Sequence, residues 1–270
     1  MVVQHNLSAM NTSRQMNGVA SSLSKSTEKL SSGYKINRAG DDAAGLSISE
    51  KMRSQIRGLN KASSNAQDGI SLIQVAEGAL NETHSILQRM NELATQAAND
   101  TNTSTDRTAI QAEIDQLQSE INRIQSTTQF NTMNLLDGSF SEKNLQIGAL
   151  SGQKISVSIG KMNTVCLAID SLKMSSFSAA GKAMEAIQAA IDKVSTQRST
   201  LGALQNRLEH TINNLDTTSE NTQSAESRIR DTDMASEMVE YSKNNILSQA
   251  GQSMLAQANQ QTQGVLSLIQ

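Results

Sequence analysis

The apolar residues in the middle of the chain follow the spacing of a helix seam. From residue 59 onward they recur at alternating steps of three and four residues, which brings them to one face of a helix. This first seam consists of Leu59, Ala62, Ala66, Ile70, Ile73, Ala76, Leu80, Thr83, Leu87, Met90, Ala94 and Ala97. A polar stretch without apolar side chains follows at 99–105. The pattern therefore predicts one long helix that ends near Asn99.

Two further segments repeat the helical spacing. One seam consists of Ile110, Ile114, Leu117, Ile121, Ile124 and Thr128. The other consists of Met184, Ile187, Ile191, Val194, Leu201, Leu204, Leu208 and Leu215, and extends to about Ile229. Ser104 or Thr105 is the expected N-cap of the first of these helices. Asp106 would then lie in its first turn, where a negative charge interacts favourably with the helix dipole.

Between residues 131 and 170 the period changes from that of a helix to that of a strand. Apolar residues alternate with polar ones at Leu145, Ile147, Ile155, Val157 and Ile159. This alternation is typical of half-buried strands. Turn residues lie between them, from Gly148 to Gly152. The sequence therefore predicts a small β-hairpin at about 144–160, set between the helices.

Both chain ends carry sparse apolar residues at helical spacing. The candidates for contacts between subunits are Leu7, Met10, Leu23, Leu30, Met238, Tyr241, Leu255, Val265 and Leu268. The surrounding residues are mostly Ser, Asn and Gln, so neither end buries enough apolar surface alone to offset its loss of chain entropy. We expect both segments to be marginal in a monomer and to order when they find partners. Such ends suggest a subunit that assembles.

Composition favours long helices. The chain has no proline and no tryptophan, and aromatic residues make up 2% of it. Since proline is the main helix breaker, long uninterrupted helices are permitted everywhere. Few large rings suit helices with a narrow buried seam. The expected fold class is all-α: an elongated antiparallel helical bundle or coiled coil with a small β-hairpin, in which the N- and C-terminal helices pair.

The net charge and the lengths of the apolar runs limit the kinds of partner that the chain can bind. The net charge of -3 argues against a nucleic-acid binder, which would carry a basic patch. No apolar run approaches the roughly 18 residues of a membrane span, so no membrane insertion is expected. Met1–Met10 lacks the pattern of a signal peptide. Residues 1–40 are mildly basic and residues 231–270 mildly acidic, so the two ends can attract each other.

The sequence contains almost no catalytic or metal-binding patterns. His5, His84 and His210 are far apart, without metal-ligand spacing, and no glycine-rich phosphate loop occurs. Cys166 is the only cysteine, so no intrachain disulfide is possible, and we interpret it as a small buried residue in a strand. Asp41 and Asp42 precede Ala43–Ala44, which indicates a helix N-terminus. We expect no enzyme activity and no cofactor.

Several motifs in order resemble those of the bacterial flagellins. In the N-terminal part they are Lys29–Asn37 (KLSSGYKIN), Asp41–Gly45 (DDAAG), Asn65–Ile70 (NAQDGI) and Glu77–Glu82 (EGALNE). In the C-terminal part they are Arg228–Ala235 (RIRDTDMA), Ile246–Gly251 (ILSQAG), Leu255–Asn259 (LAQAN) and Val265–Gln270 (VLSLIQ). The similarity covers roughly residues 1–160 and 180–270. Each motif alone is weak, but the ordered set is highly specific.

The resemblance implies a structural subunit that polymerises into the flagellar filament for motility. Residues 1–42 and 231–270 would form the inner domain at the filament core, and residues 43–230 the outer helical bundle. Only residues 161–178 stand where larger flagellins carry variable outer domains, so this is a short form. Implied partners are further copies of the chain, a flagellar export chaperone, and the cap and hook-associated proteins. Export would use the flagellar type III apparatus and place the protein outside the cell.

The resemblance also implies a surface that Toll-like receptor 5 of a host recognises. Leu87–Ala94 (LQRMNELA) is similar to the family's receptor motif, with Gln88, Arg89 and Leu93 at its contact positions and Glu113 on the next helix. Arg89 and Leu93 are four residues apart, so we expect them on one face, in a single patch. Met90–Asn91 departs from the family pattern. The alternative is that these residues mainly serve packing between subunits.

Other functions remain as alternatives. A hook–filament junction protein of the same apparatus would share the terminal helices, although the match through Val265–Gln270 favours a flagellin. A secreted coiled-coil adhesin or a type III translocator would carry a receptor domain or lipid-facing apolar stretches, and neither is visible. A flagellin with an enzymatic insertion is excluded by the short segment at 161–178.

Overall fold

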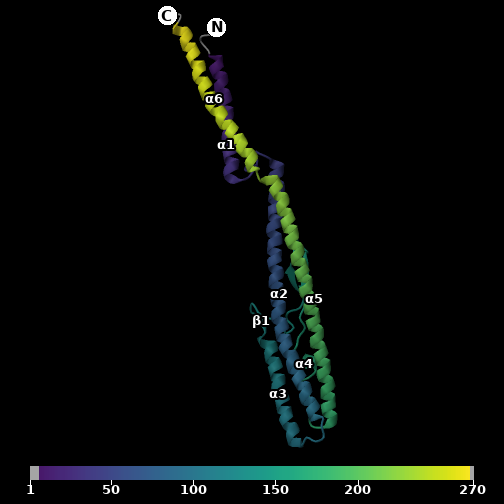
Figure 1. The fold of residues 1–270 in the computed structure, drawn as a ribbon. Helices are drawn as coiled ribbons and strands as arrows, with labels where there is room; N and C mark the ends of the chain where they lie inside the picture. The colour runs from purple at the N-terminus through teal and green to yellow at the C-terminus, as the bar shows by residue number, and fades with distance from the viewer. Residues whose placement is uncertain (1–5, 268–270) are drawn as a thin grey trace. The chain divides into compact units, whose positions relative to one another are not determined.

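The structure, a computed structural model, describes the backbone of residues 6–267 and the side chains of residues 6–261. The chain forms two compact units. Unit 1 contains the chain up to Ser54 and from Asn221 onward, and unit 2 contains Gln55–Glu220. The described residues are mainly helical, with two short antiparallel strand pairs (Figure 1). The all-α fold class with a small hairpin is therefore confirmed.

In unit 1 the two terminal helices lie side by side. Helix α1 (Leu7–Ser32) runs antiparallel to α6 (Met234–Ser267) (Figure 1). The side chain of Asn6 caps the start of α1 by accepting a hydrogen bond from the Ala9 N–H. Gly33, with φ at +75°, ends the helix in the left-handed conformation that glycine adopts without strain. The predicted pairing of the N- and C-terminal helices is confirmed.

Unit 2 is built on three long helices. They are α2 (Ala43–Ala97), α3 (Ser104–Thr127) and α5 (Phe177–Arg230), and unit 2 holds the parts of α2 and α5 that lie within 55–220. Most residues of the three apolar seams meet in one core, whose fully buried side chains include Ile73, Leu80, Leu87, Met90, Ile114, Ile121, Ile187, Val194, Leu201 and Leu208. The seam residues Leu59, Ala62 and Leu215 form a small separate cluster. Burial of these seams is the main stabilising term of the unit.

The helix starts show one correct and one wrong prediction. Helix α2 begins directly after Asp42, whose carboxylate accepts a hydrogen bond from the Gly45 N–H at 2.9 Å, as expected for an N-terminal aspartate. The N-cap of α3 is Thr103, so the expectation of Ser104 or Thr105 is wrong. Thr103 and Asp106 form a reciprocal capping box, and these hydrogen bonds lower the pKa of Asp106. Because a capping box joins the N-cap residue to the third residue of the helix, the position of Asp106 makes Thr103 the N-cap.

The predicted β-hairpin is confirmed, and a second one accompanies it. Strands β3 (Lys143–Gln146) and β4 (Lys154–Val157) pair antiparallel, with Leu145 opposite Ile155. Strands β1 (Gln129–Phe130) and β2 (Met133–Asn134) form the second pair. Its turn residues, Asn131 and Thr132, have φ of +47° and +64°, as tight two-residue hairpin turns require. Strands of two residues are too short to show an alternation in the sequence.

Cys166 does not lie in a strand. It belongs to the short helix α4 (Thr164–Leu167) and is exposed, so the expectation of a buried strand residue is wrong. Asn163 begins this turn by accepting a hydrogen bond from the Cys166 N–H at 2.9 Å. The side chains that this turn buries are those of Thr164 and Leu167, at 4% and 1% exposure. In this helical turn Cys166 therefore faces solvent, whereas the predicted strand would have buried it.

Candidate functional site: the terminal helix pair

Helices α1 and α6 contact each other along a seam with heptad spacing. On α1 the half-buried or buried seam residues are Ala9, Thr12, Met16, Val19, Leu23, Ser26 and Leu30. On α6 they are Glu237, Tyr241, Asn244, Ser248, Gly251, Leu255 and Ala258. Many of these side chains are small, and Cα atoms of the two helices come within 8 Å of each other. The seam is close-packed but buries little apolar surface.

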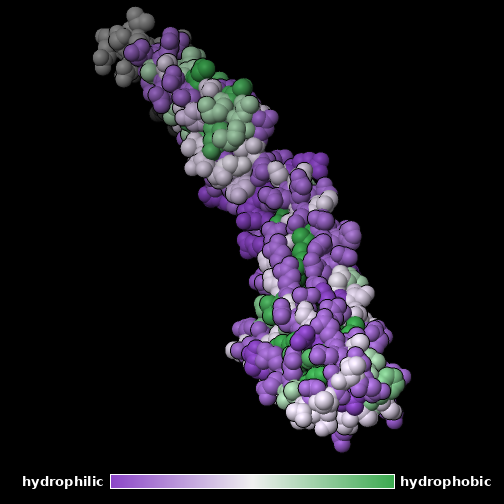
Figure 2. Space-filling view, turned by 60° about the horizontal axis from the view of Figure 1, so that its bottom comes forward, coloured by the Kyte–Doolittle hydropathy of each residue, from purple (hydrophilic) through white to green (hydrophobic). Residues whose placement is uncertain are grey.

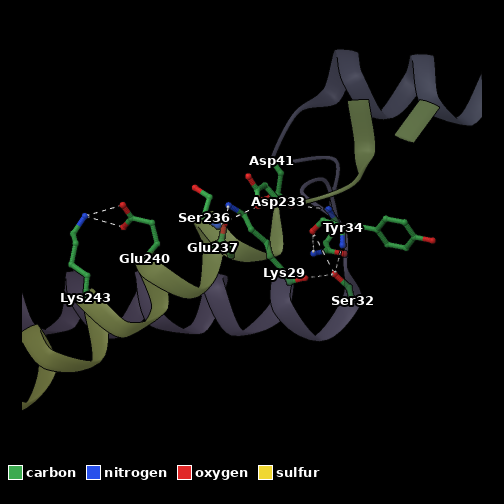
Figure 3. Close-up of polar contacts among 10 residues, drawn as sticks. Lys29, Ser32, Tyr34, Asp41, Asp233, Ser236, Glu237, Glu240 and Lys243 are labelled. Carbon is green, nitrogen blue, oxygen red and sulfur yellow. Dashed lines mark hydrogen bonds and ion pairs between the residues drawn. The ribbon is translucent and has the colours of Figure 1, made fainter. Parts of the chain in front are cut away.

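Polar contacts fix the register of the pair at both ends. The Asn6 side-chain amide donates a hydrogen bond to the Ala258 carbonyl at 3.0 Å. At the other end Lys29 Nζ lies 3.3 Å from Glu237 Oε2, with the two side chains 33% and 13% exposed (Figure 3). This pair joins the basic N-terminal segment to the acidic C-terminal one. Its partial burial makes it stronger than an open surface pair.

A short backbone bridge follows directly after the end of α1. Tyr34 pairs antiparallel with Asp231, and the Thr232 N–H donates to the Gly33 carbonyl at 3.0 Å. The Arg230 guanidinium lies 2.9 Å from a Glu50 carboxylate oxygen and 4.7 Å from the centre of the Tyr34 ring. The segments that connect α1 and α6 to the rest of unit 1 are thus tied to each other by both backbone and side chains.

The loop between α1 and α2 is ordered by its own carboxylate. Asp41 accepts hydrogen bonds from the backbone N–H groups of Arg38 and Asn37, at 3.0 and 3.2 Å. These hydrogen bonds favour the charged form and lower the pKa of Asp41. The paired aspartates of the sequence therefore have structural roles, one in the loop and one at the start of α2.

The predicted polymerisation residues divide into two groups. Leu23, Leu30, Tyr241 and Leu255 are half-buried in the α1–α6 seam, where they hold one chain's two helices together. The exposed group comprises Leu7, Met10 and Met238, whose exposures are 65%, 63% and 50%. The side chain of Val265 and the whole of Leu268 lie outside the described residues.

The predicted polymerisation residues leave out most of the exposed apolar side chains of α6. These are Met234, Val239, Ile246, Leu247 and Met254, all between 45% and 68% exposed. Figure 2 shows hydrophobic residues gathered on the surface of the helix pair. A second signal was available in the sequence, because residues 244–270 contain no Asp, Glu, Lys or Arg. A solvated helix would carry charges there, and this one does not.

The predicted receptor residues lie on α2 and α3 of unit 2. Arg89 Nη2 lies 3.0 Å from Glu113 Oε1, and Arg89 Nη1 lies 3.1 Å from Glu92 Oε2. The hydrogen bond with Glu113, followed by that with Glu92, raises the pKa of Arg89. Gln88 is exposed, with its amide nitrogen 3.1 Å from His84 Nε2.

Leu93 does not lie on the surface where the receptor patch was expected. It is 2% exposed and belongs to the core of unit 2, whereas the Arg89 side chain is 52% exposed. The prediction that the two side chains form one exposed patch is therefore wrong. Although the residues are four apart, Leu93 lies between two core positions, Met90 and Ala94, and turns inward with them.

Two other kinds of site are absent from the part of the chain that the structure describes. No three His, Cys, Asp or Glu residues there lie close enough together to hold a metal ion. None of the described helices combines the length and apolar character that crossing a membrane requires.

Comparison with known proteins identifies the family. The family model for the bacterial flagellin N-terminal helical region matches residues 3–141, and that for the C-terminal helical region matches residues 184–269. A flagellin of Halalkalibacterium halodurans is 56% identical over 100% of both chains. The flagellar filament 31.3 kDa core protein of Treponema maltophilum is 51% identical, again over 100% of both chains.

Solved structures agree with this. The crystal structure of Bacillus cereus flagellin is 31% identical with a TM-score of 0.52, covering 56% of this chain and 88% of that one. A putative flagellar hook-associated protein from Vibrio parahaemolyticus has a TM-score of 0.61 at 12% identity, covering 71% of this chain and 100% of that one. The latter likeness concerns the fold alone. The chain belongs to the bacterial flagellin family and is a structural, non-enzymatic subunit of a flagellar filament.

Proposed function

We propose that the α1–α6 pair is the part of the subunit that polymerises. The observation that carries the proposal is the exposed apolar surface of this pair. Met234 and Met238, Val239 and Ile246, and Leu247 and Met254 lie on three different sides of α6, none of them covered by α1. A helix with apolar residues all round is normally buried on all sides. Several neighbouring copies, rather than a single dimer partner, would supply that burial.

The same proposal divides the subunit by role. Residues 1–42 and 231–270 form the inner, assembling domain, and residues 43–230 form an outer body whose core does not depend on neighbours. The sparse apolar seam of α1 and α6 supports the prediction that the pair is marginal in a monomer and ordered in the filament. Export through the flagellar type III apparatus to the outside of the cell, assisted by a flagellar chaperone and by cap and hook-associated proteins, is part of this proposal.

Replacing one exposed apolar residue tests the polymerising surface. Ile246 is 66% exposed, so its side chain contributes little to the stability of the isolated subunit. Burying an isoleucine between subunits contributes about 1.5–3 kcal/mol. Ile246→Gln should therefore raise the monomer concentration left in equilibrium with filaments roughly tenfold or more. Sedimentation after growth from wild-type filament seeds measures that concentration.

The matched control is Gln249→Ala on the same helix. Gln249 is exposed and contacts Asn245 within α6, and alanine preserves helix propensity. This variant should polymerise like the wild type. Equal polymerisation by Ile246→Gln and Gln249→Ala would show that the apolar surface of α6 does not contribute to assembly.

Recognition by Toll-like receptor 5 is a second proposed role, supported by the exposed ion pair between Arg89 of the motif Leu87–Ala94 and Glu113 of α3. Glu113 holds the guanidinium across two helices, so Arg89 is presented to a partner in a fixed position. Gln88 lies beside it on the exposed side of α2. Leu93 contributes through the core of unit 2, by holding this part of α2 in place.

Arg89→Ala should weaken binding of the monomer to the receptor ectodomain at least tenfold, since arginine is a frequent hot-spot residue. Biolayer interferometry with immobilised ectodomain measures the affinity. The control is Arg123→Ala, because the Arg123 side chain is 61% exposed on α3 and its ion pair is with Glu120 of the same helix turn. Leu93→Ala is unsuitable, since it would open a cavity in the core. Equal affinities of the two arginine variants would contradict the receptor role of Arg89.

A further inference from the structure

The two flanks of the α1–α6 pair differ in shape. Because the helices are antiparallel, positions that directly follow the seam on α1 and positions that directly precede it on α6 lie on opposite flanks. On the first flank the structure has a groove of about 530 Å³. It is lined by Ala9, Met10, Ser13, Arg14, Asn17 and Leu255.

The opposite flank carries an apolar ridge. Leu247 and Met254 directly precede the seam residues Ser248 and Leu255, and they are 45% and 62% exposed. They are seven residues apart, so they lie one above the other, separated by about 10 Å along the helix. Leu255 lines the groove while its neighbour Met254 belongs to the ridge. Groove and ridge therefore lie at about the same level of the pair.

Building on the proposed polymerising role of α1 and α6, we propose that the Leu247–Met254 ridge of one copy packs into the Met10–Leu255 groove of a second copy. No charge would be desolvated on the ridge side, since α6 carries none after Lys243. Arg14 is the one charged residue that lines the groove, and it is exposed, with its guanidinium bonded to Asn11 at 2.9 Å. It can stay solvated at the rim of the contact.

Placement on opposite flanks determines the symmetry of the contact. A two-fold dimer needs one surface patch that is complementary to itself. Here the groove and the ridge face away from each other, so a copy that receives a ridge still offers its own ridge to the next copy. Such head-to-tail contacts continue from copy to copy and generate rings or open helices. A second copy of this chain is thus the occupant for which the two surfaces fit.

Cysteine cross-linking tests this contact directly. The chain would carry Met10→Cys and Met254→Cys with Cys166→Ser, which removes the only native cysteine. A disulfide needs Cα atoms within about 7 Å, which opposite flanks of one chain do not offer. Mild oxidation of seeded filaments should produce a ladder of dimers, trimers and longer covalent chains in non-reducing gels. Oxidised monomer should produce none.

Two controls complete the test. A mixture of the two single-cysteine chains should stop at dimers, because each copy then has one reactive end. A second pair, Ser13→Cys with Leu247→Cys, repeats the measurement with the other residues of groove and ridge. Filaments that form but give no ladder with either pair would overturn the proposed contact while leaving polymerisation by the helix pair intact. Normal filament growth by Ile246→Gln would instead count against the polymerising role itself.

Discussion

A chain that ends at Arg230 should not polymerise at all, even with abundant wild-type filament seeds. Removing residues 231–270 takes away α6 and every exposed apolar side chain that it carries. It also leaves α1 without its seam partner, without the hydrogen bond from Asn6 to Ala258 and without the ion pair between Lys29 and Glu237. Since α1 buries too little apolar surface to be stable alone, both halves of the polymerising surface are lost. Electron microscopy and sedimentation of seeded reactions measure the outcome.

The truncation leaves the stable body of the subunit in place, so it separates assembly from folding. The core of unit 2 uses residues between Ala66 and Leu208, none of which is removed. Its main thermal transition, followed by circular dichroism, should therefore stay within a few degrees of that of the full chain. Filament growth by the truncated chain would contradict the assignment of polymerisation to the terminal pair.

The long helices could be predicted from the sequence because their seams decide the structure. Apolar residues that recur at alternating steps of three and four positions leave only one face of a helix to be buried. The absence of proline means that no such helix is interrupted. The missed parts are those held by individual hydrogen bonds between segments that are far apart in the sequence. Gln111 donates to the Leu172 carbonyl at 3.0 Å and accepts from the Met174 N–H at 2.9 Å. In the sequence it is one more polar residue on a helix surface.

The candidate site was harder to predict, because the same residue type serves two purposes there. Leu23 and Met10 both follow helical spacing, yet one fills the seam within the subunit and the other points to solvent. Spacing identifies a face but not the partner that covers it. Similarly, Arg89 and Leu93 are near in sequence, but the boundary between core and surface of α2 runs between them. Only the positions of α3 and α5 fix where that boundary lies.

Unit 2 should respond strongly to a cavity at Leu87. This side chain is 0% exposed, within the core that α2, α3 and α5 share. Leu87→Ala removes buried methyl groups that the surrounding long helices cannot replace by moving, because each helix is held by core contacts on either side of the site. The expected loss of unfolding free energy is about 2–5 kcal/mol. Urea denaturation followed by circular dichroism should show a lower midpoint with an unchanged slope.

The control for Leu87→Ala is Val75→Ala on the same helix, where the side chain is 41% exposed. A partly solvated valine loses little transfer free energy on truncation, so this variant should shift the midpoint far less. Leu87→Ala should still join wild-type seeds at temperatures below its own unfolding, since Leu87 belongs to the core of unit 2 and the proposed polymerising surface belongs to α1 and α6. Leu87→Ala should thus reduce stability without reducing assembly, and Ile246→Gln should reduce assembly without reducing stability. This pair of results would show that the folding core and the polymerising surface consist of separate sets of residues. Equal midpoints for the two variants would instead mean that the α2 seam is not the core on which unit 2 depends.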